Sequence, residues 1–280
     1  MKTLELTKKI EEILKNGNIE EFKAEAKLIV LNTAKLSMDK IVLDVEVKED
    51  IAKKTLEIAK ERIETKKPIQ QLLGSAYFMG SVFKISENTL IPRDETEFLV
   101  LKAIEKIETI KKEKIHILDI GTGSGIIPIS IALNTKNVEI LGVDISTSAL
   151  TIAIENAQKY LPSNIVLFRK SDLFSNIKET FDVIVSNPPY IPIKEKENLQ
   201  KEVLFDPDLA LFAPDNDGVY FYKKIIENAK NHLKENGYVL FELGIGQSKL
   251  VEDILKENNF KNIEIVKDLA GIERVIIGQA

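Results

Sequence analysis

The chain has 280 residues, 44% of them hydrophobic, so it can bury a sizeable core and is long enough for one or two domains. It has no cysteine and only two histidines, which excludes disulfides and a thiol nucleophile and leads us to expect no metal site. The formal net charge of -5 is the opposite of the basic excess expected of a sequence-independent nucleic-acid binder, so we expect no direct nucleic-acid partner.

The N-terminal part of the chain has a helical pattern. Its first residues, MKTLELTKKIEEI, carry charges every few positions where a secretory segment would be apolar. No apolar run in the chain approaches the roughly 20 residues of a membrane span, and we therefore expect a cytoplasmic protein without membrane contact. From Leu4 to Lys67 apolar residues recur at helical spacing, which predicts a small helical domain over residues 1–75.

A short link and a larger domain follow. In AYFMGSVFKISENTLIPR, hydrophobic residues lie on both sides of Gly80, which predicts a hairpin linker over residues 76–93. Over residues 94–280 strands and helices alternate, which predicts a doubly wound α/β domain. The last segment, NIEIVKDLAGIERVIIGQ, has room for two strands and a loop but no helix, so its final strand is expected to run antiparallel.

A glycine-rich loop follows the first strand of this domain and predicts a nucleotide site. The loop reads Asp119, Ile120, Gly121, Thr122, Gly123, Ser124, Gly125. Its glycines allow a tight turn and close approach of the backbone to a ligand. A dinucleotide fingerprint would require a small residue where Ile126 stands. Asp119 would repel a pyrophosphate and attract an ammonium or sulfonium, as in S-adenosyl-L-methionine.

Acidic residues at the next two strand ends extend the predicted cofactor site. Asp144 ends the second strand, where a carboxylate accepts both ribose hydroxyls. Asp172 and Leu173 follow the third strand and are expected to supply an acceptor for the adenine amino group and an apolar wall. We interpret His116, inside the first strand, as structural.

The segment FDVIVSNPPYIP places a polar residue, two prolines and an aromatic residue at the end of a buried strand. The prolines hold Asn187 and Pro188 extended and remove backbone donors. An acceptor-rich turn with Tyr190 beside it suits a planar NH2 group, although Asn-Pro alone is also typical of an ordinary strand end.

These motifs, in this order, resemble class I adenosylmethionine-dependent methyltransferases. The outer segments LIPRDETEFLV, DPDLAL, DNDGVYFY, FELGIGQ and DLAGIERV narrow the resemblance to the peptide chain release factor glutamine methyltransferases, the HemK/PrmC type, over residues 68 to 280. Two positions depart from the family pattern: Asp94 stands where proline is usual, and Leu173 where an aromatic residue is common. The roles of Asp94 and Glu97 stay open between a helix cap and a cover over the cofactor.

The resemblance implies a seven-stranded methyltransferase sheet and a defined reaction. The methyl group would pass from S-adenosyl-L-methionine to the glutamine side chain of the Gly-Gly-Gln motif in class I release factors, with the helical domain docking the factor. The implied acceptor-binding residues are Asn187, Pro188, Pro189 and Tyr190; Asn187, Pro188 and Tyr190 would be catalytic, and Asn187 would also face the cofactor. We expect a monomer. A ribosomal-protein glutamine methyltransferase, an adenine-N6 methyltransferase of nucleic acids and a non-enzymatic docking module remain alternatives.

Overall fold

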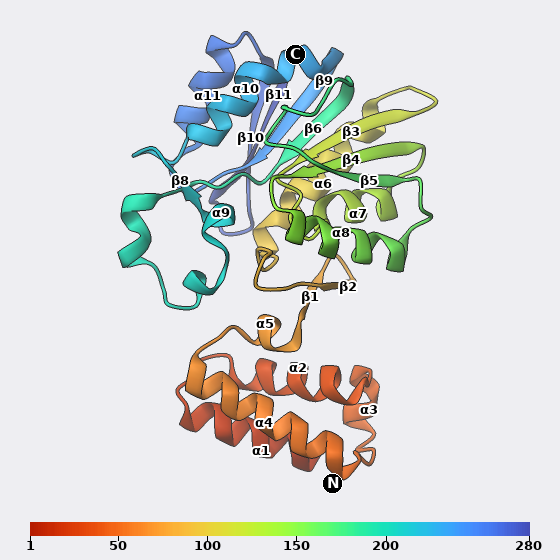
Figure 1. The fold of residues 1–280 in the computed structure, drawn as a ribbon, viewed down its shortest axis with the longest axis vertical. Coiled ribbons are helices and arrows are strands. Elements are labelled where there is room, and N and C mark those ends of the chain that lie inside the picture. The colour runs from red at the N-terminus through yellow and green to blue at the C-terminus, as the bar shows by residue number, and fades with distance from the viewer. The chain divides into compact units, whose positions relative to one another are not determined.

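The structure is a computed structural model that describes all residues 1–280. Its contacts divide the chain into two compact units (Figure 1). The first contains Met1–Ala76 and Gln200–Phe205, and the second contains Tyr77–Leu199 and Asp206–Ala280. No helix is long and apolar enough to cross a membrane, and no group of three or more His, Cys, Asp or Glu side chains is placed to hold a metal ion.

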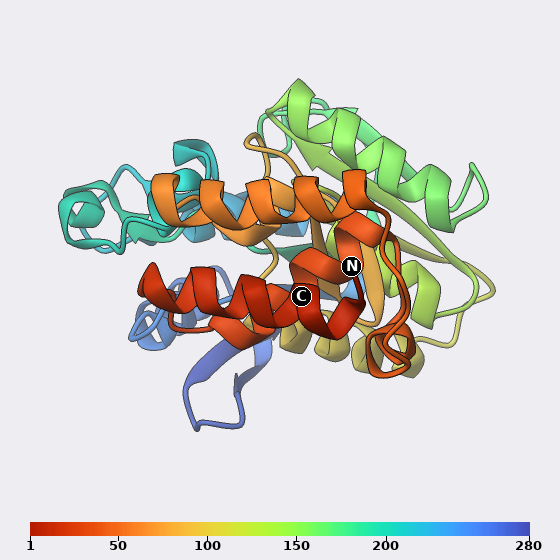
Figure 2. The same ribbon diagram turned by 90° about the horizontal axis from the view of Figure 1, so that it is seen from below.

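The first unit is helical, and Figure 2 shows its long helices side by side. Its helices are α1 (Thr3–Asn16), α2 (Phe22–Ala34), α3 (Met38–Val42), α4 (Glu49–Thr65) and α5 (Ile69–Leu73). The apolar spacing explains the packing, because Leu6, Ile10 and Leu14 recur every four residues and are fully buried against α2 and α4.

A segment from much later in the sequence completes this unit. Residues 200–205, which include the 3-10 turn Val203–Phe205, pack with the helices although the α/β domain was predicted to run unbroken from residue 94. Arg62 of α4 is almost fully buried and donates to Glu25 of α2 at 2.9 and 3.0 Å and to Glu202 at 2.5 Å. The buried guanidinium therefore joins two helices and the returning segment.

The second unit is built on a seven-stranded sheet in the order β10-β11-β9-β6-β3-β4-β5. The strands are β3 (Ile115–Ile120), β4 (Val138–Asp144), β5 (Val166–Lys170), β6 (Phe181–Ser186), β9 (Leu233–Glu242), β10 (Lys261–Lys267) and β11 (Glu273–Gln279). β11 runs antiparallel to both of its neighbours, whereas β9, β6, β3, β4 and β5 are parallel. The predicted doubly wound sheet with an antiparallel last strand is confirmed.

Helices cover both faces of this sheet (Figure 1). One face packs against α6 (Asp94–Thr109), α7 (Ile126–Asn134) and α8 (Thr147–Tyr160), and the other against α10 (Tyr220–His232) and α11 (Ser248–Glu257). Buried on both sides, β6 is apolar at four of its six positions, as parallel central strands usually are for most of their length. A short helix, α9 (Asp208–Leu211), a 3-10 turn (Ile193–Asn198) and a parallel pair, β7 (Ile191–Pro192) and β8 (Phe212–Ala213), lie between β6 and α10.

The predicted hairpin is β1 (Ser75–Phe78) and β2 (Ser81–Lys84). Side chains of the second unit hold it. The Glu97 carboxylate accepts from Met79 N at 2.8 Å, and Asn156 Oδ1 accepts from Lys84 N at 2.8 Å. Arg93 is the N-cap residue of α6, and no side chain caps that helix end. Glu97 is therefore an anchor for the hairpin and does not form a capping box with Asp94.

Candidate active site

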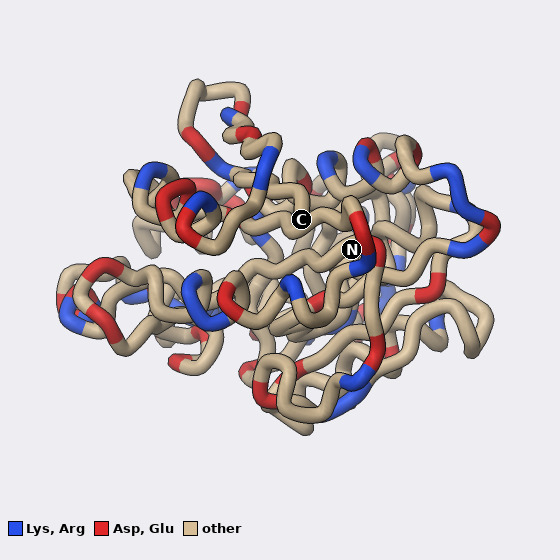
Figure 3. Tube along the Cα trace, turned by 90° about the horizontal axis from the view of Figure 1, so that it is seen from above, with Lys and Arg blue, Asp and Glu red and all other residues tan.

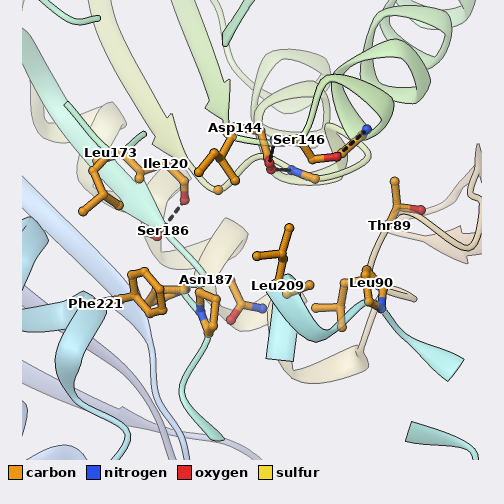
Figure 4. A pocket seen from close by; sticks show the side chains of 18 of the residues that line it. Thr89, Leu90, Ile120, Asp144, Ser146, Leu173, Ser186, Asn187, Leu209 and Phe221 are labelled. Atoms are coloured by element: carbon orange, nitrogen blue, oxygen red, sulfur yellow. Dashed lines mark hydrogen bonds between the residues drawn. The ribbon is translucent and has the colours of Figure 1, made fainter. Parts of the chain in front are cut away.

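A cavity of about 240 Å³ lies at the carboxyl ends of the central parallel strands, where ligands of open α/β sheets bind. Figure 4 shows Asp144 and Ser146 on one side of it and Asn187, Leu209 and Leu90 on the other. Of the predicted site residues, the following line it: Gly121, Gly123, Asp144, Asp172, Leu173, Asn187, Pro188 and Pro189. The other predicted site residues, Asp119, Thr122, Ser124, Gly125 and Tyr190, do not.

The glycine loop presents bare backbone to the cavity. Gly121 and Gly123 have φ of +75° and +55°, and the space where a Cβ would stand is open at both. A side chain at either position would fill that space as well as strain the backbone. Gly125, with φ +79°, has a second reason to lack a side chain, since a Cβ would lie 3.1 Å from Ala153 and 3.2 Å from Phe168.

Asn156 of α8 anchors the glycine-rich loop through hydrogen bonds. Its side chain is buried, and its Nδ2 donates to the Ser124 carbonyl and to the Lys84 carbonyl, both at 2.9 Å. Its role was not predicted from the sequence, because an asparagine inside a helical pattern carries no signal for a contact so far along the chain.

Asp144, at the end of β4, binds the loop and faces the cavity. Its two carboxylate oxygens accept from Gly123 N and from Ser146 N, both at 2.8 Å. Burial raises the pKa of Asp144, and the backbone hydrogen bonds oppose this rise. Each oxygen uses one backbone donor, so acceptor capacity remains for ligand hydroxyls.

Asp119 lies beneath the loop at the end of β3 and is fully buried. Neither of its carboxylate oxygens has a hydrogen-bond partner, and the Thr122 hydroxyl is also unpaired. Burial raises the pKa of Asp119 to about 7; an interaction with the Thr122 hydroxyl opposes this rise and the negative charge of Asp144 reinforces it. A buried carboxyl of this kind favours a cationic ligand group nearby.

Asp172 is exposed at the rim of the cavity, and Leu173 beside it has a left-handed backbone with φ +47°. The Ser171 hydroxyl donates to the Leu173 carbonyl at 2.8 Å and stabilises this turn. A left-handed backbone is unfavourable for leucine, so the surrounding turn must hold Leu173 in this conformation.

Asn187 comes directly after β6 and reaches the first turn of α6. Its Nδ2 donates to the Thr96 hydroxyl at 3.4 Å, so the amide oxygen is the end left for a ligand. Asn187, Pro188 and Pro189 line the cavity, whereas the half-buried Tyr190 does not and its ring lies beside Gly244. Burial raises the pKa of Tyr190 well above its usual value, so the phenol stays neutral.

Gln247 braces the turn that contains Tyr190. Its Nε2 donates to the carbonyls of Tyr190 and Asp217, both at 2.9 Å. Gly218, with φ +71°, lies so close that a Cβ would stand 2.0 Å from the Tyr190 carbonyl oxygen. The segments DNDGVYFY and FELGIGQ, noted in the sequence without an assigned role, thus support the Asn-Pro-Pro-Tyr turn.

The lining of the cavity also includes residues that were not predicted from the sequence. Asn88, Thr89, Leu90, Ile120, Ile145, Ser146, Ala149, Ser171, Ser186, Pro207, Leu209, Ala210, Phe221 and Ile225 also line it. The buried Asp206 carboxylate accepts from Arg93 at 2.6 Å and from Ile91 N at 3.1 Å. These bonds join two segments of the cavity lining, the one that contains Leu90 and the one that contains Leu209. The motifs LIPR and DPDLAL were the sequence features that could have indicated this part of the site.

The cavity fits the predicted S-adenosyl-L-methionine. Gly121 and Gly123 open a backbone cradle, Asp144 has acceptor capacity for ribose hydroxyls, and the unpaired Asp119 lies where positive charge is favourable. Apolar side chains such as Leu173 and Ile145 provide walls for a planar base.

Known proteins match the chain over nearly its whole length. A family model described as a methyltransferase domain matches residues 111–276. The release factor glutamine methyltransferase of Fusobacterium nucleatum is 40% identical and the alignment covers 97% of this chain and 77% of that protein. Its counterpart in Thermodesulfovibrio yellowstonii is 38% identical, with 91% of each chain covered.

Among solved structures, the hMettl16 catalytic domain in complex with the MAT2A 3'UTR hairpin 6 matches with a TM-score of 0.57 over 82% of each chain. At 16% identity this likeness supports the methyltransferase fold alone. The sequence identities decide the family, and the prediction from the motifs is confirmed: this chain belongs to the release factor glutamine methyltransferases, which are S-adenosyl-L-methionine-dependent enzymes.

Proposed function

We propose that this protein methylates the side-chain amide nitrogen of the glutamine in the Gly-Gly-Gln motif of class I peptide chain release factors. The observation that carries the proposal is the orientation of Asn187, whose NH2 end donates to Thr96 and whose oxygen is left to accept from an amide NH2. Family membership supports the same substrate. Such an enzyme acts in the cytoplasm, where release factors work, and as a monomer.

The cofactor is held by residues of the loop and the strand ends. Gly121, Gly123 and Gly125 shape the backbone cradle, with Thr122 and Ser124 between them, and Asp144 accepts the ribose hydroxyls. Asp119 favours the cationic end of the cofactor, Asp172 accepts from the adenine amino group, and Leu173 and Asn187 complete the wall. When bound, S-adenosyl-L-methionine supplies an electrophilic methyl group on a sulfonium.

The Asn-Pro-Pro-Tyr turn prepares the acceptor amide. A carboxamide nitrogen is a weak nucleophile because its lone pair is delocalised into the carbonyl. Asn187 Oδ1 and the Pro188 carbonyl accept its two hydrogens, which fixes the lone pair and stabilises the positive charge that grows on nitrogen. Pro189 keeps the turn rigid and Tyr190 excludes water. The methylated nitrogen then loses one of its protons, which is acidic enough to need no strong base.

The helical unit has a separate task, which is to dock the release factor. A variant that lacks residues 1–74 is expected to lose more activity on the whole factor than on a short glutamine peptide. Equal loss on both substrates, with adenosylmethionine affinity retained, would assign the helical unit a different role.

Labelled adenosylmethionine and peptide mass spectrometry test the proposal. The protein is incubated with a class I release factor, with the same factor carrying Gly-Gly-Asn in place of Gly-Gly-Gln, with ribosomal proteins and with an adenine-containing oligonucleotide. Methylation of the Gly-Gly-Gln glutamine alone supports the proposal. Methylation of another substrate in preference to it would replace the proposed target.

The distribution of charge agrees with a protein substrate. Figure 3 shows Lys and Arg interspersed with Asp and Glu along the chain, and the formal net charge is -5. A nucleic-acid methyltransferase would need a basic surface to neutralise phosphates.

A further inference from the structure

A buried carboxyl group lies beside Asn187 at the end of the neighbouring strand. Glu242 is the last residue of β9, and its exposed fraction is 2%. In the parallel register of β6 and β9, Ser186 pairs with Phe241, so Asn187 and Glu242 follow at the same end of neighbouring strands. Glu242 is not among the residues that line the cavity, so we assign it no direct contact with the substrate.

No cation forms an ion pair with this carboxyl group. The nearby Arg274 is engaged by Asp268 at 2.9 Å and by Glu95 at 3.0 Å, and Glu242 Oε2 has no hydrogen-bond partner. Burial raises the pKa of Glu242 to about 7. The charge of Glu95 raises it further, whereas Arg274 and hydrogen bonds from Thr96 and Asn187 oppose the rise. Burial of an acid without a cation is costly, so a compensating function is expected.

Thr96 connects the two side chains. It is buried to 2% exposure in the first turn of α6, and its hydroxyl accepts from Asn187 Nδ2 at 3.4 Å and interacts with Glu242. A hydroxyl that accepts from Asn187 donates its own hydrogen onward, and the carboxyl is the acceptor on that side.

We propose that Glu242, together with Thr96, is a positioning residue that fixes the amide orientation of Asn187. Both present acceptors to the NH2 end of Asn187, so its oxygen is turned toward the acceptor glutamine. In the reversed orientation the Asn187 oxygen would meet the Glu242 oxygens, and its NH2 would meet the NH2 of the substrate. The contact between the two NH2 groups is repulsive, and the contact between the Asn187 oxygen and Glu242 is repulsive whenever the carboxyl is ionised, which makes one orientation dominant.

This inference rests on the proposed role of Asn187, and a double-mutant cycle separates the two. Single-turnover methyl transfer to the release factor is measured for the wild type, Asn187→Ala, Glu242→Met and the double variant. We expect Glu242→Met to lower the rate about 10- to 100-fold, as a misplaced catalytic group does. In the Asn187→Ala background the same change should have no further effect beyond about twofold.

Conservative variants sharpen the test. Glu242→Gln keeps an acceptor oxygen toward Asn187 and is expected to stay within about threefold of the wild type. Thr96→Val removes the hydroxyl at nearly constant shape and should also lose rate only when Asn187 is present, so it serves if Glu242→Met does not fold. Asp182→Asn removes a buried carboxylate at the opposite end of β6 and controls for general disturbance of the sheet.

The outcomes are distinct. An active Asn187→Ala variant would refute the proposed site itself. If Asn187→Ala is slow but measurable and Glu242→Met lowers the rate by the same factor in both backgrounds, Glu242 has a structural role and the positioning inference fails. It also fails if Glu242→Gln is folded and as slow as Glu242→Met, because charge and not hydrogen-bond acceptance would then matter.

Discussion

Asp119→Asn is expected to stabilise the protein without cofactor and to weaken cofactor binding. Burial raises the pKa of Asp119 from its usual 3.8 to about 7. Between these two values the folded protein keeps a proton that the unfolded chain has lost, so the free energy of unfolding falls as pH rises from about 4 to about 7. Above that window the folded protein contains a buried, unpaired carboxylate.

The size of the effect follows from the pKa. The rise from 3.8 to about 7 corresponds to roughly 4 kcal/mol at about 1.4 kcal/mol per pKa unit. Asparagine has nearly the same shape and no charge, so the variant escapes this cost. We expect it to be more stable than the wild type by up to roughly 4 kcal/mol at about pH 8, and nearly equal to it at about pH 4.

Hydrogen exchange of peptides from β3 and β4, measured by mass spectrometry at several pH values, follows the unit that contains Asp119. Wild type and variant are compared at each pH, which cancels the intrinsic pH dependence of exchange. Calorimetry gives the adenosylmethionine affinity, which we expect to be lower in the variant because a favourable negative charge is lost.

Asp182→Asn is a matched control with the opposite sign. Burial tends to raise the pKa of Asp182, but hydrogen bonds from Lys112, Lys234 and the His116 amide lower it overall. A lowered pKa stabilises the folded protein above the unfolded value, so this variant should be less stable than the wild type at pH 8. An Asp119→Asn variant with the same stability difference at pH 4 and pH 8 would refute the reasoning.

Three further variants probe the loop. Asp144→Ala should weaken adenosylmethionine binding by roughly 10- to 100-fold, through loss of a charge-assisted acceptor of about 1.5 to 3 kcal/mol and of its bond to Gly123; unchanged affinity in calorimetry would remove Asp144 from the site. Gly125→Ala should lower stability by roughly 1 to 3 kcal/mol, because φ is +79° and a Cβ would contact Phe168 at 3.2 Å; an unchanged melting temperature would contradict this. Asn156→Ala removes two buried hydrogen bonds and should lower the free energy of unfolding by about 1 to 3 kcal/mol and weaken cofactor binding. A loss of stability with unchanged cofactor affinity would show that the loop keeps its shape without Asn156.

Local patterns in the sequence were enough to predict the fold class and the glycine loop. The alternation of strands and helices after residue 94 predicts a doubly wound sheet. There is no room for a helix before the last strand, so that strand must run antiparallel, as observed. The loop with its three glycines, and each aspartate at a strand end, can be recognised locally. The conformation of each turn depends on residues that are neighbours in the sequence.

Contacts between distant segments were decided only by the tertiary structure. Nothing in the spacing of Asn156, Glu242 or Gln247 indicates that their side chains reach the loop or the Asn-Pro-Pro-Tyr turn, and residues 200–205 show no sign that they return to the helical unit. The physical reason is that a hydrogen bond or a buried ion pair depends on distance in space. Sequence periodicity reports which face of an element is buried, but not which partner meets it there.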